Sequence, residues 1–447
     1  MFTKKMTIDG VPEAALKGSM RDFRVMEGAN LLGRCDAFYN WQDTRRQAGM
    51  WPFSRSTETG PASTCAVRDD CGNLTTGVNF ASQDYLSLSS HPAVLEAAKA
   101  AIDEFGAHSA GSPALVGNTS TSVVLERRLA QFLKMEDAVL FPTGWAAGFG
   151  VIKGLVRSHD YIVMDALAHA CLQVGAQAAT RNVVLFRHND VEHCRSRLQD
   201  IRRRDPNAGV MVVTEGLFSM DSDTPDITAL QDLAHEYGAT LMVDVAHDLG
   251  CLGTDGTGHI GIQNMLGKVD LVMGSFSKTF GSNGGFVATR SRAVKEYLRF
   301  YSPSCTFSNA LSPAQLATVT KALDIVESGE GQELRGKLMS NIVNLRARIR
   351  ARGMDCYGDP SAIVAVKTGD EALARMTARA LPEMGLISNL VEFPAVGKGL
   401  ARFRLQVMAG HTDEEITAAA DRLNAAMQLA QARLDAGFDA TEQRLAG

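Results

Sequence analysis

Short apolar segments and helical segments alternate along the middle of this chain, from about residue 92 onward. The apolar segments "AVLFPTG", "YIVMDA", "VMVVTEGLF", "TLMVDVAH" and "LVMGSF" are rich in Val, Leu and Met and are bounded by Gly or Asp, which is typical of strands buried on both faces. Between them lie segments with helical periodicity, such as "PAVLEAAKAAIDEFG" and "ITALQDLAHEYG". The pattern predicts an α/β fold with a mostly parallel sheet between helices.

The sequence changes character on either side of this region. Near residue 325 a long charged helical segment begins, "GQELRGKLMSNIVNLRARIRARG", and the strand-like "AIVAVKTG" and "ARFRLQVM" follow it. The first 75 or so residues are rich in Gly, Ser and Thr between more regular stretches. We therefore predict an N-terminal extension with a segment of a small domain in residues 1–91, a large ligand-binding domain in 92–324, and a smaller α+β C-terminal domain in 325–447.

Composition narrows the classes of function. The formal net charge is −5, from 45 basic and 50 acidic residues spread along the chain, so no basic surface suited to nucleic acid or to a membrane is expected and small-molecule chemistry is favoured. The eight cysteines form no CxxC pair, which argues against a zinc site or a disulfide scaffold. No uninterrupted apolar run approaches about 18 residues, so we expect a cytoplasmic protein.

Polar or glycine residues follow four of the apolar segments, where the strands are expected to end. In an open α/β sheet, ligands bind beyond the carboxyl ends of the strands. The candidates are the turn at Gly144, Asp165 with His169, Asp244 with His247, and the stretch from Ser275 to Lys278. Four such strand ends in one domain predict a binding site at that edge of the sheet.

These residue types match the needs of pyridoxal 5'-phosphate. This cofactor requires an amine that forms an imine with its aldehyde, a carboxylate that keeps its ring nitrogen protonated, and donors for its phosphate. Lys278 supplies an amine and Asp244 a carboxylate. The turn at Gly144 offers backbone N–H groups at the start of a helix, and Ser275 adds a hydroxyl.

Each of these residues also has an ordinary structural interpretation when it is taken alone. A lysine is most often a solvated surface charge, and Asp244 has the position of a helix N-cap or turn residue. His169 and His247 are explained equally by structural hydrogen bonds, and Trp145 by packing in the core. Their joint placement favours the cofactor site, because a histidine just past a strand end can stack on the ring and one three residues after Asp244 can bind the phenolic oxygen.

Eight segments, taken in order, resemble the successive motifs of the α-oxoamine synthases, a family of pyridoxal-phosphate enzymes of fold type I. The resemblance covers roughly residues 78–430 at the spacing of the family. The segments are "NFASQDYLSLSSHPAVLEAA", "FPTGWAAGFGVI", "DALAHACL", "TEGLFSMDSDTPDI", "VDVAHDLGCLG", "GSFSKTFGSNGGF", "TFSNALSP" and "ARFRLQVMAGHT".

This resemblance implies an enzyme that condenses an amino acid with an acyl thioester and releases carbon dioxide and a thiol to give an α-amino ketone. It also implies a homodimer, with the acyl group supplied as a thioester of coenzyme A or of an acyl carrier protein. By this resemblance the catalytic residues are Lys278, His169, Asp244 and His247, the cofactor-binding residues include Gly144, Trp145, Ser275 and, from the second subunit, Ser308, and Arg404 holds the substrate carboxylate.

The chain departs from the usual family pattern at five positions. Val245 stands where an acidic residue is usual, Asp248 where a serine is usual, and Trp145 where a tyrosine is more usual. In the glycine-rich loop, Ser122 stands in place of a histidine, and Pro113 in place of the arginine of some members. These changes leave the imine chemistry intact and bear on the identity of the substrates.

Several alternatives remain open at this stage. Within the family we favour an enzyme similar to serine palmitoyltransferase, acting in sphingolipid biosynthesis with serine, and a synthase of biotin, threonine or secondary metabolism is the nearest alternative. An aminotransferase would need only the same lysine and aspartate. A non-catalytic partner subunit is disfavoured because Lys278 is present.

Overall fold

The computed structural model describes residues 2–437 and 439–444, which group into two compact units. One unit is Gln83–Met339, and the other combines Met1–Ser82 with Ser340–Gly447. The domain limits suggested by the sequence, after residues 91 and 324, stay a prediction.

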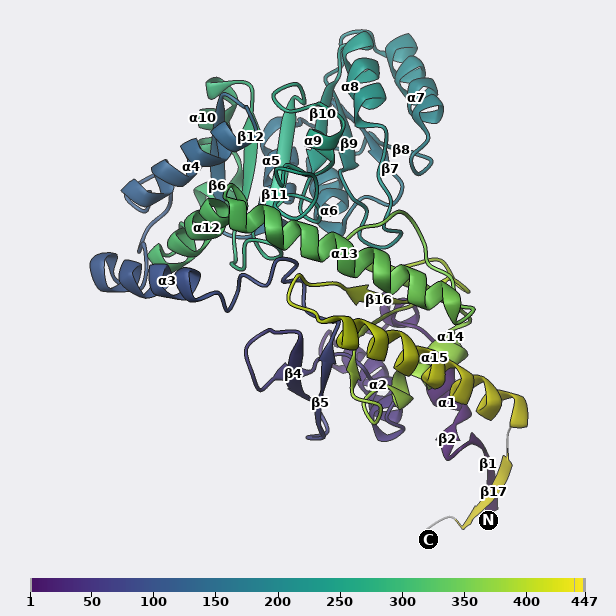
Figure 1. Ribbon diagram of the computed structural model, residues 1–447. Coiled ribbons are helices and arrows are strands. Elements are labelled where there is room, and N and C mark those ends of the chain that lie inside the picture. The colour runs from purple at the N-terminus through teal and green to yellow at the C-terminus, as the bar shows by residue number, and fades with distance from the viewer. Residues whose placement is uncertain (1, 438, 445–447) are drawn as a thin grey trace. The chain divides into compact units, whose positions relative to one another are not determined.

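A seven-stranded sheet forms the centre of the Gln83–Met339 unit (Figure 1). The strand order is β6-β12-β11-β10-β9-β7-β8, with β12 antiparallel to both of its neighbours and the other adjacent pairs parallel. The predicted α/β fold with a mostly parallel sheet is therefore confirmed. The strands are β6 (Asp137–Phe141), β7 (Tyr161–Asp165), β8 (Val183–Phe186), β9 (Val210–Glu215), β10 (Thr240–Asp244), β11 (Leu271–Ser275) and β12 (Gly285–Thr289).

Helices surround this sheet, and α5 packs on β11 and β12 and against α6. Side chains of α5 and α6 such as Val151, Ile152 and Leu172 are fully buried in one core with Met242 and Val287 from the sheet. The helices are α3 (Pro92–Phe105), α4 (Ser120–Phe132), α5 (Gly144–Leu155), α6 (Ala170–Ala179), α7 (Val191–Arg204), α8 (Ile227–Glu236), α9 (Gly258–Ile262), α10 (Arg292–Tyr301), α11 (Pro303–Thr306) and α12 (Pro313–Val326), and α13 (Gly329–Ala351) begins here.

Capping residues explain where two of the helices begin. Oγ1 of Thr143 accepts the N–H of Ala146 at 2.9 Å, and Oδ1 of Asp226 accepts the N–H of Ala229 at 2.8 Å. Each bond satisfies a backbone donor that the first helical turn leaves without a partner. Because α5 starts directly after β6, its N-terminus lies at the carboxyl edge of the sheet.

The other unit contains three small sheets and four further α-helices within its described residues. The sheet orders are β13-β16-β15, β14-β5-β4-β3 and β17-β1-β2. The strands are β1 (Phe2–Ile8), β2 (Val11–Pro12), β3 (Ser56–Thr57), β4 (Thr64–Arg68), β5 (Leu74–Asn79), β13 (Ile363–Gly369), β14 (Leu386–Ile387), β15 (Asn389–Val391), β16 (Ala401–Gln406) and β17 (Asp439–Arg444), and the helices are α1 (Glu13–Leu16), α2 (Asp36–Gln47), α14 (Glu371–Ala380) and α15 (Asp413–Ala436), with 3-10 turns η1 (Met20–Phe23) and η2 (Gly33–Cys35).

A buried charge network joins the N-terminal and C-terminal segments of this unit. Glu392 accepts hydrogen bonds from Arg45 at 3.0 Å and from Arg375 at 2.7 Å, and all three side chains are buried. Arg375 also donates to the carbonyls of Leu16 and Gly18 at 2.6 and 2.7 Å. Removing one member of this network would leave a buried charge unpaired, which is strongly destabilising. The network therefore holds the segment around Leu16 and Gly18 against α14.

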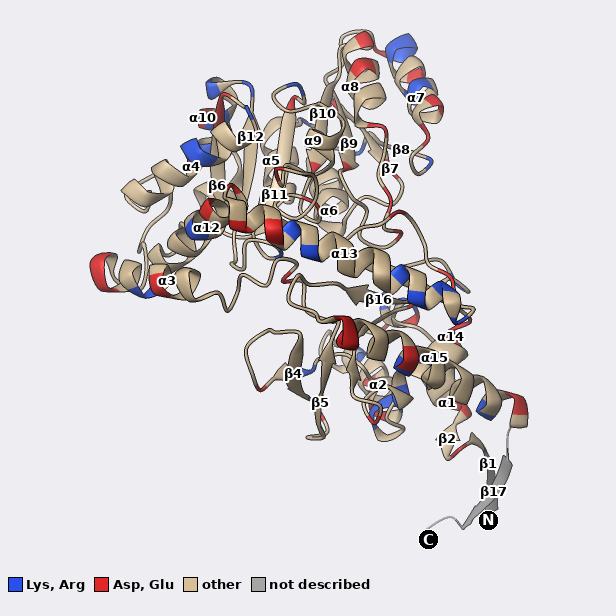
Figure 2. Cartoon of the chain, in the orientation of Figure 1, with Lys and Arg blue, Asp and Glu red and all other residues tan. Residues whose placement is uncertain are grey.

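Helices α7 and α13 carry charged residues of both signs, as Figure 2 shows. In α7, three arginines stand in the last turn and Glu192 in the first, which is the favourable order for the helix dipole. Over the described residues, no helix is both long enough and apolar enough to cross a membrane.

Candidate active site

The carboxyl ends of β7, β9, β10 and β11 lie at one edge of the sheet, and each strand ends on a polar residue. Glu215 is paired with Asp244 in the register of β9 and β10. A cavity of about 220 Å³ lies at this edge. Among its lining residues are Gly144, Trp145, His169, Asp244, His247, Ser275, Ser277 and Lys278, which the sequence had selected, together with Thr143, Cys171, Glu215, Ala246 and Met273.

Two buried carboxyl groups, Asp244 and Glu215, line this cavity. Burial raises the pKa of Asp244, and the charges of His169 and Lys278 oppose that effect. Burial also holds the pKa of Glu215 well above its usual range, and the charge of Asp244 raises it further. Oδ1 of Asp244 accepts the N–H of Ala246 at 2.9 Å. A cation placed next to Asp244 would stabilise its carboxylate form.

His169 is the N-cap residue of α6, and its backbone and ring have separate partners. Its N–H donates to Oε1 of Glu215 at 2.6 Å. Its Nδ1 accepts the N–H of Cys171 at 3.3 Å and lies 3.0 Å from the Sγ of that residue. Burial raises the pKa of the Cys171 thiol, as do the charges of Asp244 and Glu215, so this cysteine is a neutral packing group. These contacts orient the imidazole of His169 at the cavity.

His247 follows β10, three residues after Asp244, and is buried. Its Nδ1 lies within 2.9 Å of the hydroxyl of Tyr85, which is fully buried. This hydrogen bond fixes the position of the His247 ring. Sequence reasoning missed Tyr85, because no local pattern indicates that a tyrosine 162 residues away will meet this histidine.

The N-terminus of α5 approaches β11 very closely. A Cβ at Gly144 would lie 2.3 Å from both the Cβ and the Oγ of Ser275, so only glycine fits there. Oγ of Ser275 lies 2.8 Å from Oγ of Ser277. The first N–H groups of a helix lack partners within the helix and bind anions. Hydroxyl groups and helix N–H groups thus meet at one place that suits a phosphate.

Lys278 lies in the turn after β11 and is half-buried. Its carbonyl accepts the N–H of Gly281 at 3.1 Å, and Gly281 has a φ of +60°, in the region that favours glycine. The "GSNGG" stretch therefore closes the turn that carries the lysine and returns the chain into β12.

Asp165 ends β7 but does not line this cavity. It is buried and accepts hydrogen bonds from His188 at 2.9 Å and from the N–H of Leu167 at 2.8 Å. His188 also hydrogen-bonds Asp223 at 2.9 Å. Burial lowers the pKa of His188, but the two aspartates outweigh this effect and raise the pKa to about 10. The charged His188 thus ties the segment before His169 to the loop that follows β9.

Besides Asp165, two predicted site residues lie outside the cavity. Ser308 follows α11, where its N–H is 3.4 Å from the carbonyl of Cys305, and the adjoining Phe307 is 86% exposed. Arg404 belongs to the other unit and is half-buried in β16, between β13 and β15. The roles of Ser308 and Arg404 stay predictions.

The departures from the usual family pattern have structural roles in the fold. The Oγ of Ser122 donates to the carbonyl of Thr119 at 2.7 Å in the first turn of α4. The fully buried Val245 donates its N–H to the carbonyl of Met273 at 2.8 Å. The fully buried Asp248 accepts the N–H of His259 at 2.7 Å.

The carbonyl of Pro113 accepts a long hydrogen bond of 3.4 Å from Arg299. Trp145 is 48% exposed and stacks on Phe149 with ring centroids 5.3 Å apart.

Glu215 is the main cavity residue that sequence reasoning left out. It ends the apolar run "VMVVTE", so the rule that selected Asp244 at the end of "TLMVD" would also have selected it. Over the described residues, no group of three or more His, Cys, Asp or Glu side chains is arranged to hold a metal ion.

Comparisons with known proteins agree on one family. The model of the aminotransferase class I and II family matches residues 75–423. The 2-amino-3-ketobutyrate coenzyme A ligase of Salmonella typhimurium is 34% identical over 380 residues, which cover 85% of this chain and 94% of that protein. The 8-amino-7-oxononanoate synthase of Thermoanaerobacter pseudethanolicus is 34% identical over 342 residues, covering 76% of this chain and 85% of that protein.

A solved structure gives the same result. Serine palmitoyltransferase from S. paucimobilis, solved with a bound aldimine of pyridoxal phosphate and myriocin, has a TM-score of 0.84 and 29% identity over 90% of this chain and all of that chain. This chain belongs to the aminotransferase class I and II family and, within it, to the α-oxoamine synthases, which are pyridoxal-phosphate enzymes that transfer acyl groups.

Proposed function

We propose that this protein condenses an amino acid with an acyl thioester, with loss of carbon dioxide, to give an α-amino ketone. The observation that carries the proposal is one cavity that holds an amine, Lys278, and a buried carboxylic acid, Asp244, beside the N-terminus of α5. In the reaction a bond forms between the α-carbon and the acyl carbon, the thiol leaves, and the carboxylate departs as carbon dioxide. A proton then returns to the α-carbon.

The cofactor is pyridoxal 5'-phosphate, and the residues of the cavity fit it. When bound, it supplies a protonated ring that accepts negative charge from the α-carbon. Asp244 would hold the proton of the ring nitrogen, and the positive ring would in turn favour the carboxylate form that burial disfavours. The N–H groups at the start of α5 and the hydroxyl of Ser275 would hold the phosphate.

The other side chains of the cavity would hold and orient the cofactor and transfer protons. Lys278 would hold the cofactor in the resting enzyme, and its amine, once released, would remove the α-proton and return it. His169 would lie against the ring, in the orientation that Glu215 and Cys171 impose on it. His247, steadied by Tyr85, would donate to the phenolic oxygen.

The amino acid that we favour is serine, with an acyl thioester of coenzyme A or of a carrier protein as the second substrate. The likeness to serine palmitoyltransferase over 90% of the chain supports this choice. The 34% identity to a 2-amino-3-ketobutyrate coenzyme A ligase supports a synthase of another substrate nearly as well. Arg404 would hold the carboxylate of the amino acid. Sphingolipid biosynthesis and a cytoplasmic location stay predictions.

The working form that we propose is a homodimer. Ser308 would contact a phosphate bound mainly by the second subunit, as the family resemblance implies. The neighbouring Phe307 supports this proposal, because its large apolar side chain is 86% exposed. Covering such a side chain with a second chain removes apolar surface from water, which favours association.

The decisive experiment combines trapping and product analysis. Borohydride treatment followed by peptide mass spectrometry should find the reduced cofactor on the peptide that contains Lys278. Amino acids are then screened with one acyl thioester, and carbon dioxide, free thiol and product mass are measured. Equimolar carbon dioxide and thiol support the condensation, whereas a keto acid formed without carbon dioxide would establish an aminotransferase instead.

A further inference from the structure

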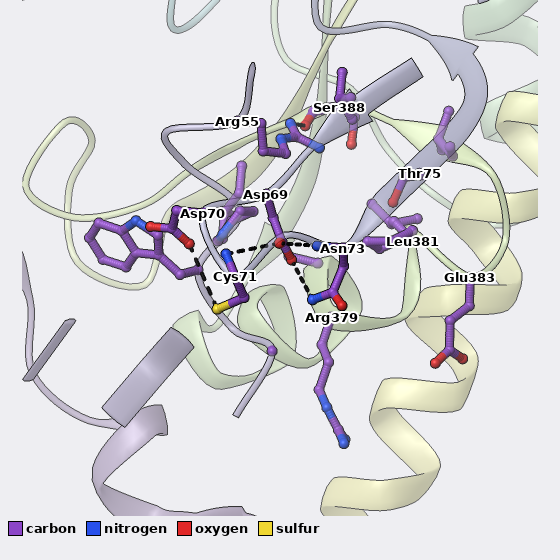
Figure 3. A pocket seen from close by; sticks show the side chains of 18 of the residues that line it. Arg55, Asp69, Asp70, Cys71, Asn73, Thr75, Arg379, Leu381, Glu383 and Ser388 are labelled. Atoms are coloured by element: carbon purple, nitrogen blue, oxygen red, sulfur yellow. Dashed lines mark hydrogen bonds between the residues drawn. The ribbon is translucent and has the colours of Figure 1, made fainter. Parts of the chain in front are cut away.

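A cavity of about 470 Å³ lies within the unit formed by residues 1–82 and 340–447 (Figure 3). The turn between β4 and β5 forms one part of its wall, and the segment that follows α14 forms another. Trp51 and Phe403 supply large apolar surfaces, and both are buried. The cavity thus combines an apolar wall with several charged groups.

Most of the charged groups around this cavity already have partners. Arg46 is paired with Asp70 at 2.5 Å, and Arg379 with Asp9 at 2.8 Å. Asp69 accepts the N–H groups of Cys71 and Asn73 at 3.0 and 2.8 Å, as well as the side-chain amide of Asn73. Figure 3 shows these bonds within the turn.

Arg55 differs from the other arginines of the cavity. It donates one hydrogen bond, from Nη2 to the carbonyl of Ser388 at 2.7 Å, and no carboxylate of the described residues lies within ion-pair distance of it. Burial lowers the pKa of Arg55, and the neighbouring Cys65 opposes this effect. A guanidinium has five N–H donors, so most of the hydrogen-bonding capacity of Arg55 is unused among the described residues.

Ser388 provides the second observation. Its side chain is 4% exposed, its Oγ is buried without a hydrogen-bond partner among the described residues, and it lines the same cavity. A buried hydroxyl without a partner destabilises the fold, because it gives up its hydrogen bonds to water without replacement. Figure 3 shows Arg55 and Ser388 next to each other on one side of the cavity. An unpaired cation and an unpaired donor therefore lie side by side at an apolar wall.

We propose that this cavity binds a small organic carboxylate. The carboxylate would accept hydrogen bonds from Arg55 and, once the Ser388 side chain turns toward the cavity, from its buried Oγ, and the apolar part of the ligand would lie against Trp51 and Phe403. A doubly charged phosphate fits less well than a singly charged carboxylate, because it would find one cation without an ion-pair partner and would face the carboxylates of Asp69 and Glu383. This inference does not depend on the proposed reaction, since every residue that carries it lies outside the Gln83–Met339 unit.

The test is isothermal titration calorimetry of the full-length protein loaded with its cofactor, with hexanoate as the probe. Hexanoate should bind in the millimolar range or more tightly, as a ligand of this size can. Hexanamide has the same shape without the charge and should bind at least about tenfold more weakly, as should inorganic phosphate. The Lys278→Ala variant should bind hexanoate as the unaltered protein does, which separates this cavity from the candidate active site.

Three variants assign the binding to the two residues. Arg55→Gln should weaken hexanoate binding by about tenfold or more, and Ser388→Ala by about threefold to tenfold. Ser388→Ala removes only a hydroxyl without a partner, so it should fold at least as well as the unaltered protein. Arg379→Gln is the matched control, because this arginine lines the same cavity but is paired with Asp9, and it should leave binding unchanged.

Equal binding of hexanoate and hexanamide, or unchanged hexanoate binding by the Ser388→Ala variant, would overturn the proposal. So would an absence of hexanoate binding in the unaltered protein over the millimolar range.

Discussion

At the level of single residues, Lys278 carries the most direct prediction. Lys278→Ala should remove the cofactor adduct that borohydride traps and should lower turnover by at least about 10² to 10⁴, the range that a positioned acid or base contributes. The fold should survive, because Lys278 is only half-buried and lies in a turn. Peptide mass spectrometry and steady-state kinetics make the measurement. Lys268→Ala, at an exposed lysine ten residues earlier, is the control.

Asp244→Asn should bind cofactor but lose most of its activity. An amide cannot hold the proton of the ring nitrogen through a charge-assisted hydrogen bond, so negative charge at the α-carbon is less well stabilised. We expect the exchange of the α-proton of the amino acid with D2O, followed by NMR, to slow by about 10² or more. Exchange at the unaltered rate would show that the carboxylate has no part in this step.

Asp248 predicts a dependence of stability on pH. Burial raises the pKa of this carboxyl from 3.8 to about 7, so the folded protein binds a proton that the unfolded chain releases. The free energy of unfolding should therefore fall as pH rises from about 4 to about 7, by at most about 1.4 kcal/mol per pH unit. The Asp248→Asn variant keeps an oxygen that can accept the N–H of His259, but its amide cannot ionise. The free energy of unfolding of this variant should therefore not fall over this pH range.

Urea denaturation of both proteins at pH 5 and pH 8 measures the effect. Any difference between the packing of the variant's amide and that of the carboxyl group would change the free energy of unfolding by the same amount at both pH values. The change in unfolding free energy between pH 5 and pH 8 can therefore still be compared between the two proteins. Identical slopes in the two proteins would mean that Asp248 is not the titrating group.

At the level of the secondary-structure elements, His188 connects the end of β7 to the loop after β9. The raised pKa, about 10, means that protonated His188 stabilises the folded state below the unfolded pKa near 6.5 and that this contribution is lost as pH rises through about 10. His188→Gln should therefore be less stable than the unaltered protein at pH 6.5, and the difference should shrink towards pH 10. Thermal unfolding across this range measures it.

The control for this comparison is His159→Gln, at a histidine whose side chain is 78% exposed. A stability difference for His188→Gln that stayed constant from pH 6.5 to pH 10 would rule out the charged clamp between Asp165 and Asp223.

At the level of the whole molecule, the proposed dimer predicts that assembly and cofactor binding are linked. A cofactor held by two chains binds the dimer and not the monomer, so removing it should raise the dimer dissociation constant in analytical ultracentrifugation. Ser308→Ala should raise the cofactor dissociation constant by up to about tenfold, the loss of one hydrogen bond to a charged group.

Mixed dimers give the sharper comparison. When Lys278→Ala chains are mixed with Ser308→Asp chains, a shared site restores activity in the heterodimers, because one of the two sites in each heterodimer receives both unaltered residues. A fully active monomer at assay concentration would refute the proposed assembly.

The sequence alone was sufficient for the fold class and the family. The alternation of apolar runs and helical segments predicted the sheet, and the motifs around Gly144, Asp244 and Lys278 identified the α-oxoamine synthases, which the comparisons confirm. Both kinds of signal are local: periodicity reports which face of an element is buried, and a motif keeps its chemical residues at fixed short spacings. The amino acid substrate remained open, because substrate choice depends on surfaces that no short segment defines.

Only the tertiary structure decided which distant residues meet. The register of β9 and β10 pairs Glu215 with Asp244, and Tyr85 reaches His247 across 162 residues. Arg55 and Ser388, separated by 333 residues, come together in a second cavity that no sequence pattern indicated. The physical reason is that the periodicity of a segment reports its own buried face, whereas strand order, register and loop packing are set by how all the elements share one core.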